Sequence, residues 1–201
     1  VLFDTLNLIN TQTSNGGSAL SVESVATNFS IRNSILSSVV TTSKNTVFLD
    51  SNSPDAMINC LLYGGYTGVL IDGYSIVTLR NLTMVDCNRS GIQGPGAGGA
   101  PTVINCVAYN SAFQDYDVGA VGWDAASSNN ASGDTTAPGT SSITGITADD
   151  FTDYANGDYS AASGGALDGV GANLDTVFTD DIIGYTRPAS PDPWTMGAYE
   201  I

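Results

Sequence analysis

The sequence contains no histidine and only five lysine and arginine residues, against 20 aspartate and glutamate residues, which gives a formal net charge of −15. Without histidine, the common general base of neutral-pH chemistry is missing, and a Ser-His-Asp triad cannot form. A surface this acidic repels phosphate backbones and anionic lipids. We therefore expect no nucleic-acid partner, and we interpret the acidity as a source of solubility or as a sign of a salt-rich or calcium-containing extracellular setting.

Cysteine is also scarce, with only Cys60, Cys87 and Cys106. An odd number cannot all pair within one chain, and no two of the three form a Cys-x-x-Cys motif. Since a zinc site needs more such ligands, we expect no metal site and no cofactor. We predict that the three cysteines are small buried hydrophobic residues of a β core.

Long hydrophobic runs are missing as well. No apolar segment approaches the length of a transmembrane helix, and no signal peptide is visible, so we expect no membrane insertion. No segment sustains the 3.6-residue period of an amphipathic helix. Short apolar runs rich in Val, Ile and Thr are instead bounded by Gly, Asn, Ser and Asp, which is typical of β-strands.

What the chain does have is a recurring asparagine flanked by apolar residues. Its five positions are Asn7, Asn33, Asn59, Asn81 and Asn105, with spacings of 26, 26, 22 and 24 residues. The first copy is the weakest, because Thr5 stands where the others have an apolar residue. A period of this length indicates a solenoid, a propeller or an array.

Each repeat has room for three short strands and three turns. One strand is expected about ten residues before the asparagine, at 19–22, 47–50, 69–72 and 91–93, and another directly after it, at 35–36, 61–63 and 107–109. Turns are expected at 53–55, 72–73 and 94–99. We predict an all-β fold, a right-handed parallel β-helix of about five to six coils with an irregular C-terminal cap.

The asparagine has a physical reason in such a coil. At a tight bend, asparagine tolerates a left-handed backbone conformation. Stacked at the inter-strand spacing of about 4.8 Å, its amide can donate to one neighbouring asparagine and accept from the other. We therefore predict a continuous ladder of amide hydrogen bonds through the five asparagines.

The regular pattern decays after residue 110. Asn129 or Asn130 closes a sixth coil, at 24 or 25 residues past Asn105. Residues 127–150 are rich in small polar residues and are expected to form a long surface excursion. We divide the chain into coils at 1–126 and an irregular loop and cap at 127–201 that packs on the last coil.

The ending carries a resemblance. It contains Asp180-Asp181-Ile182-Ile183-Gly184-Tyr185-Thr186-Arg187-Pro188 and then Trp194-Thr195-Met196-Gly197-Ala198-Tyr199-Glu200. With the asparagine coils, it resembles right-handed parallel β-helix proteins of the pectate-lyase-like superfamily, as found in phage and bacterial extracellular proteins. Ile183 and Thr195 replace acidic residues of the family pattern. The resemblance implies that the tail folds back over the last coil as a cap.

Two aspartates are candidates for catalysis. Asp50 and Asp72 follow equivalent strands 22 residues apart, and if they stack, their carboxyl groups lie about 5 Å apart, as in a retaining glycosidase. The alternative is that each aspartate closes a strand and opens a turn, as Asp72-Gly73 indicates. Arg32 and Arg80 are expected to point outward, either to bind an anionic sugar or as solvated charges.

Aromatic residues gather late in the sequence, either as a sugar platform or as the packing of the cap. Their positions are Tyr109, Phe113, Tyr116, Trp123, Tyr154, Tyr159, Tyr185, Trp194 and Tyr199.

Two functional hypotheses follow. The first is a structural or carbohydrate-binding module of an extracellular assembly, such as a tailspike, fibre or capsid-decorating protein on a virion surface, with other protein subunits and possibly polysaccharide as partners. The second is a polysaccharide-depolymerising hydrolase or lyase that uses Asp50 and Asp72. Because Val1 begins inside what reads as a repeat, we also expect the chain to be processed or a piece of something longer, with its first coil in contact with further protein.

Overall fold

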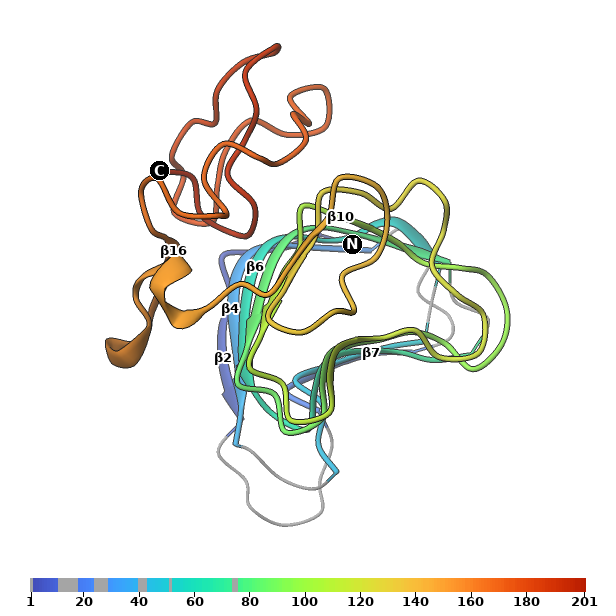
Figure 1. The fold of residues 1–201 in the computed structure, drawn as a ribbon. Helices are drawn as coiled ribbons and strands as arrows, with labels where there is room; N and C mark the ends of the chain where they lie inside the picture. The colour runs from blue at the N-terminus through green and yellow to red at the C-terminus, as the bar shows by residue number, and fades with distance from the viewer. Residues whose placement is uncertain (1, 11–17, 24–28, 40–42, 51, 74–75) are drawn as a thin grey trace.

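The computed structural model describes residues 2–10, 18–23, 29–39, 43–50, 52–73 and 76–201. These residues form an all-β parallel solenoid of about five turns, with no α-helix in the described part, which confirms the predicted fold class. Figure 1 looks along the solenoid, so that successive coils lie over one another. A small antiparallel hairpin and an irregular C-terminal segment lie beside the coils.

Two parallel sheets form the coils. The larger sheet has nine strands: β1 (Leu2–Asp4), β2 (Asn7–Asn10), β4 (Ser30–Ser38), β6 (Ser53–Gly64), β8 (Val77–Val85), β10 (Thr102–Ile104), β11 (Val107–Tyr109), β13 (Ala131–Ser132) and β14 (Ile143–Thr144). The smaller sheet has five: β3 (Leu20–Val22), β5 (Val47–Leu49), β7 (Thr67–Ile71), β9 (Ser90–Gln93) and β12 (Gln114–Asp117). The hairpin consists of β15 (Phe151–Asp153) and β16 (Asp158–Ala161), with the 3-10 turns η1 (Ala148–Asp150) and η2 (Tyr154–Asn156).

The five-stranded sheet confirms the strands predicted about ten residues before each asparagine. The strands predicted at 35–36 and 61–63 are the second halves of β4 and β6, which bend at the asparagine, whereas the strand predicted at 107–109 is the separate strand β11. One turn prediction is wrong, because Ser53 to Asp55 open β6 rather than form a turn. Ser53 is buried and its hydroxyl donates to the Phe29 carbonyl, so this segment is held in the sheet.

A row of left-handed residues marks the bend in successive coils. It consists of Thr5, Asn33, Asn59, Asn81, Asn105 and Asn129, with φ between 47° and 56°. Asn129 thus continues the row, which decides between the two predicted residues. These φ values disfavour most side chains, and asparagine is among the few that tolerate them.

Asn7 is the one ladder residue that the sequence misplaced. β2 pairs with β4 so that Asn7 lies opposite Ile35, whereas Asp4 lies opposite Arg32. Thr5 therefore occupies the bend of the first coil, with φ 55°. The first coil bends two residues earlier than its asparagine indicates, and a search for asparagine alone cannot detect that.

The amide ladder is interrupted. Asn59 donates to Asn33 at 3.2 Å and Asn105 donates to Asn81 at 3.3 Å. Asn81 donates instead to the Gly197 carbonyl, at 3.2 Å. The prediction of one continuous ladder is therefore wrong, because the C-terminal segment takes up part of its hydrogen-bonding capacity.

The core lies inside the coils and is made of stacked Val, Ile, Leu and Met side chains. Cys60, Cys87 and Cys106 are free and buried, as predicted. Desolvation by burial raises the pKa of each thiol to about 12.

Residues after β12 close the far end of the solenoid. The chain there crosses the outline of the coils in Figure 1, and Trp123 and Ala137 pack against the core. Residues 127–150 are therefore not a simple surface excursion, since β13 and β14 within them extend the larger sheet.

The C-terminal segment packs along the side of the coils, following the row of bends. Asn129 donates to the Val170 carbonyl, Asn105 exchanges two hydrogen bonds with Ala172, and Asn59 donates to the Asp180 carbonyl. We expected this tail to cover the last coil, but its contacts reach back to the second and third coils. Apolar side chains join it to the outward-facing Ile58 and Leu61.

Arg187 holds this tail together. Its side chain is fully buried, and it pairs with Glu200 at 2.7 Å. It also donates to the side-chain oxygen of Asn59 and to the Gly197 carbonyl, and its guanidinium lies 5.1 Å from the centre of the Trp194 ring. Desolvation lowers the pKa of Arg187, while the nearby Glu200 and Asp181 carboxylates oppose that shift.

Candidate functional site

Asp50 and Asp72 lie directly after β5 and β7, in neighbouring coils. Their backbone amides continue the parallel pairing, with Asp50 N–H donating to Val22 and Asp72 N–H donating to Leu49, both at 2.8 Å. The Asp72 carboxylate accepts a hydrogen bond from the Gly73 amide at 2.8 Å. Gly73 has φ +62°, and a Cβ there would lie 2.7 Å from an Asp50 carboxylate oxygen. Asp72 thus stabilises the turn at Gly73, the Asp50 carboxylate lies beside that turn, and the catalytic role of the two aspartates stays a prediction.

The outer face of the five-stranded sheet lies beside these turns. β5 alternates buried and partly exposed residues, and β7, β9 and β12 each have a partly exposed residue in the same register, as expected when one face is packed and the other solvated. The outward row in register is Ser21, Phe48, Leu70, Gln93 and Asp117. Polar Ser21 is therefore followed along the axis by two apolar side chains and then by two polar ones.

A column of stacked side chains borders this face. Tyr66, Arg89 and Phe113 lie in successive coils, joined by backbone hydrogen bonds from Arg89 to Tyr66 at 2.7 Å and from Phe113 to Arg89 at 2.9 Å. The Arg89 guanidinium lies 5.9 Å from the centre of the Tyr66 ring and 5.8 Å from that of Phe113. It is fixed by Asp117 at 2.8 Å and by Gln93 at 2.7 Å. Phe113 remains 64% exposed.

Arg32 and Arg80 lie in the other sheet, in register on either side of Ile58. Arg80 forms an ion pair with Asp55, and Arg32 donates to the Ser30 hydroxyl at 3.2 Å. Neither contact shows a sugar-binding role, so that part of the sequence interpretation stays a prediction.

Asp115 and Asp134 form a pair that the sequence did not indicate. The backbone amide of Asp115 donates to Asp134, while the Asp115 carboxylate accepts from the amides of Gly133 at 2.7 Å and Ser111 at 3.1 Å. Desolvation raises the pKa of Asp115. The pKa of Asp134 is lowered, because hydrogen bonds from Thr136 and the Asp115 backbone outweigh its own desolvation. With Tyr109 and Asn110, the pair lines a hollow of about 200 Å³.

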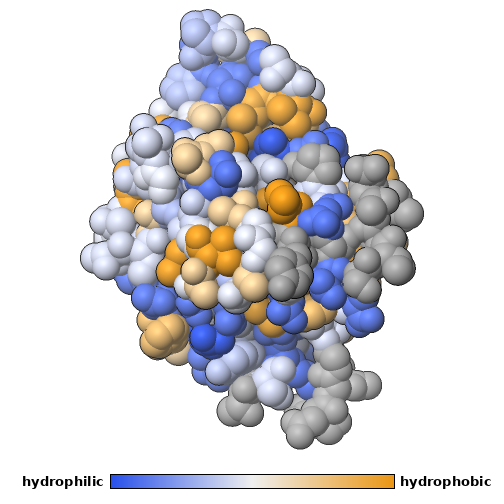
Figure 2. Space-filling view, turned by 90° about the vertical axis from the view of Figure 1, so that its right-hand side faces the viewer, coloured by the Kyte–Doolittle hydropathy of each residue, from blue (hydrophilic) through white to orange (hydrophobic). Residues whose placement is uncertain are grey.

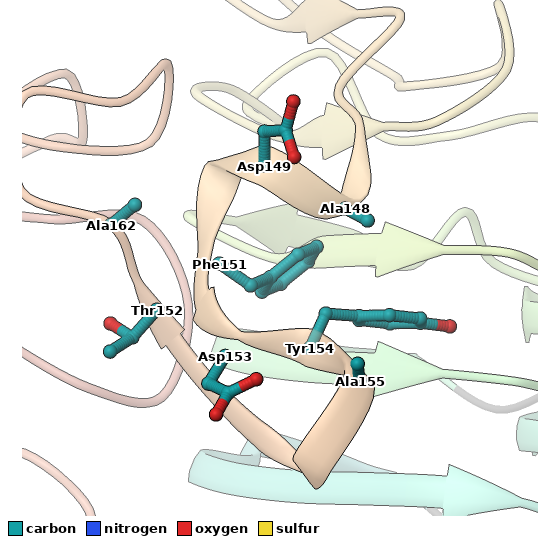
Figure 3. A pocket seen from close by; sticks show the side chains of 8 residues that line it. All are labelled: Ala148, Asp149, Phe151, Thr152, Asp153, Tyr154, Ala155 and Ala162. Atoms are coloured by element: carbon teal, nitrogen blue, oxygen red, sulfur yellow. The ribbon is translucent and has the colours of Figure 1, made fainter.

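A larger hollow of about 420 Å³ lies at the hairpin. Its lining consists of Ala148, Asp149, Phe151, Thr152, Asp153, Tyr154, Ala155 and Ala162. Figure 3 shows the Asp149 and Asp153 carboxylates at opposite ends of it, with Phe151 between them.

Aromatic contacts fix this hairpin to the larger sheet. The Tyr109 ring centre lies 5.4 Å from that of Phe151 and 5.1 Å from that of Tyr154. Tyr154 donates its hydroxyl proton to Asp86. Tyr63 and Tyr159 extend the cluster. Several late aromatics therefore pack the C-terminal region, as one of the two interpretations predicted, whereas Phe113 and Tyr185 stay exposed.

Sequence reasoning missed a second row of bends, formed by Gly64, Asp86 and Asn110, each with positive φ. Asp86 and Asn110 are 24 residues apart, the same interval as Asn81 and Asn105, so spacing offered a signal.

Among the described residues, no three His, Cys, Asp or Glu side chains are grouped to hold a metal ion. In the same part of the chain no helix has the length and apolarity to cross a membrane.

Comparison with known proteins does not assign this chain to a family. No family model, no curated protein and no solved structure matches this chain. The parallel solenoid is established by the structure, while the superfamily resemblance remains an inference from the sequence.

Proposed function

We propose that this chain is a structural or carbohydrate-binding β-helix module of an extracellular assembly, of the kind found on virion surfaces. The observation that carries the proposal is the outer face of the five-stranded sheet with its bordering column of Tyr66, Arg89 and Phe113. Successive coils present these side chains at a regular interval of about 4.8 Å, which suits an extended polymer. Aromatic rings with hydrogen-bonding neighbours are suited to sugar rings and their hydroxyl groups.

Two further features support a place in an assembly. Large apolar side chains are exposed on the first coil, with Leu2 at 59% and Ile9 at 60%, and exposed apolar side chains on a sheet edge favour contact with other protein. The C-terminal sequence that carries the resemblance also packs on the coils, where its Arg187 pairs with Glu200 and donates to Asn59. Elsewhere the surface is mixed: Figure 2 presents a face on which apolar patches are small and separated by hydrophilic side chains.

A glycan microarray tests the binding role. We expect wild-type protein to bind at least one class of polysaccharide on the array. We expect the double variant Tyr66→Ala with Phe113→Ala to bind it about tenfold or more weakly, since stacked aromatic contacts contribute about 0.5–1.5 kcal/mol each. Ile183→Ala, which alters an exposed side chain on the tail, is the matched control. Equal retention by all three proteins would contradict this site.

Sedimentation or native mass spectrometry tests the assembly role. We expect self-association or a stable complex with another virion or cell-surface protein, weakened by Leu2→Ser with Ile9→Ser. A chain that stays monomeric and forms no such complex would count against an assembly module.

The second candidate is a polysaccharide-depolymerising enzyme, favoured by the equivalent positions of Asp50 and Asp72 in neighbouring coils. Release of reducing ends or of unsaturated sugars by wild-type protein, and its loss in Asp50→Asn with Asp72→Asn, is the result that supports it. Equal activity in that double variant would remove these two residues from the mechanism.

A further inference from the structure

The hollow at the hairpin has features of a binding site. At about 420 Å³ it is in the size range of small-ligand pockets, which are usually mostly apolar with a few placed polar groups. Five of the eight lining residues are alanine, phenylalanine or tyrosine, and polar and apolar atoms contribute about equally to the exposed surface of the hollow. The polar groups are Thr152 and the two carboxylates, which stand at opposite ends (Figure 3).

The lining carries charge of one sign only. Asp149 and Asp153 are both exposed, and the described lining contains no lysine, arginine or histidine. The Asp153 carboxylate is held in place by the Asn156 side chain at 2.8 Å, which leaves its other oxygen available. In a chain of net charge −15, this arrangement repels anionic ligands and attracts cationic ones.

The hollow is held in a fixed shape. Phe151 is only 3% exposed and packs against Tyr109, and Tyr154 is held by Asp86. η1 is fixed because Asp150 accepts hydrogen bonds from the Thr147 amide at 2.8 Å and the Ala166 amide at 3.0 Å. A site that is already formed loses little free energy to ordering when it binds.

We propose that this hollow receives a lysine or arginine side chain of a partner protein. Such a side chain has a long apolar stem and a charged head, so the stem can lie on one of the lining alanines while the head reaches the nearer carboxylate. The idea of a protein partner rests on the assembly role proposed above. The hollow itself can be tested without that partner. If the hollow binds no basic probe, the proposed assembly role is unaffected.

The test is an NMR titration of the labelled 201-residue protein with N-acetyl-lysine methylamide and N-acetyl-arginine methylamide. N-acetyl-norleucine methylamide, which keeps an apolar stem and lacks the charge, is the control probe. We expect at least one basic probe to shift the amide signals of residues 148–162 at millimolar concentration. The norleucine probe should cause far smaller shifts of the same signals. Because exposed ion pairs contribute about 0.2–1 kcal/mol each, Asp149→Asn with Asp153→Asn should weaken binding about fivefold, and Asp192→Asn should not.

Four results would overturn the proposal. Three of them are no shift with either basic probe, equal shifts with norleucine, and equal affinity in the Asp149→Asn, Asp153→Asn variant. Tighter binding of putrescine than of the capped lysine would also overturn it, since the hollow would then select a free diamine rather than a side chain. The signals of the unaffected coils report whether each variant is folded.

Discussion

The bend asparagines have two roles at the scale of the residue. Each holds a backbone conformation that few side chains tolerate, and each uses its amide to contact another segment. Asn59 is the clearest case, because it donates to Asn33 and Asp180 and accepts from Arg187. The two roles can be separated by substitution.

Asn59→Ala removes both roles at once. We expect it to reduce the free energy of unfolding by about 2–4 kcal/mol, from left-handed strain and from lost hydrogen bonds. Asn59→Gly removes only the amide and should be roughly 1 kcal/mol less destabilising, because glycine adopts positive φ freely. Urea unfolding of the two variants measures the difference. If alanine is tolerated as well as glycine, backbone strain is not what selects asparagine here.

The cysteines provide a second prediction at this scale. The thiolate is the reactive form, and burial raises the pKa of Cys60, Cys87 and Cys106 to about 12. At pH 8 the native protein should therefore react with Ellman's reagent very slowly, and all three thiols should react at once in urea. Rapid reaction of any thiol in the native protein would show that its surroundings open.

At the scale of the element, one buried arginine joins the hydrogen bonds and apolar contacts that attach the C-terminal tail to the coils. Arg187 lies among the Glu200 carboxylate, the Asn59 side chain and several carbonyl groups. Removing one member of a buried ion pair leaves the other charge without compensation, which typically costs about 3–5 kcal/mol. The stability of the tail should therefore depend strongly on this residue.

Arg187→Met is expected to lower stability by about 3–5 kcal/mol and to raise hydrogen exchange across residues 170–200 more than in the coils. Arg32→Met, at a partly exposed position, should change stability by less than about 0.5 kcal/mol. Hydrogen exchange read by mass spectrometry follows both regions in one experiment. Uniform exchange throughout the Arg187 variant would mean that tail and coils unfold together.

The strands themselves were largely predictable from the sequence. The apolar flanks of Asn33, Asn59, Asn81 and Asn105 recur at nearly constant spacing, and stacking makes each coil repeat the last. Ser53 to Asp55 were mistaken for a turn because proline and aspartate usually mark one, while the buried Ser53 hydroxyl that keeps them in β6 depends on a neighbouring coil.

The candidate site was less predictable, because much of it also depends on contacts between neighbouring coils. Asp50 and Asp72 could be placed in register from equivalent strands, since their spacing follows the coil. The column of Tyr66, Arg89 and Phe113 has no shared residue type, so only the parallel register reveals it. The hairpin hollow lies outside the repeat altogether, and its shape depends on contacts with Tyr109 and Asp86 that no local pattern encodes.

At the scale of the whole molecule, the excess of acidic over basic residues is the dominant electrostatic property. Like charges repel across the folded surface, and salt screens that repulsion. Raising sodium chloride from about 0.05 to 0.5 M should therefore raise the melting temperature by a few degrees. Differential scanning calorimetry measures this, with sucrose as a control for general solvent effects. A fall in melting temperature would mean that attractive ion pairs outweigh the repulsion.

The tail beside the coils also bears on how the molecule unfolds. Coil-to-coil contacts join residues about 22–28 positions apart, so the coils alone form a linear array that can lose its ends one at a time. The tail joins residues 147 positions apart, from Asp180 to Asn33. Its binding surface exists only when several coils are stacked together. The tail therefore couples coils that do not touch one another, and it should turn gradual fraying into a single cooperative transition.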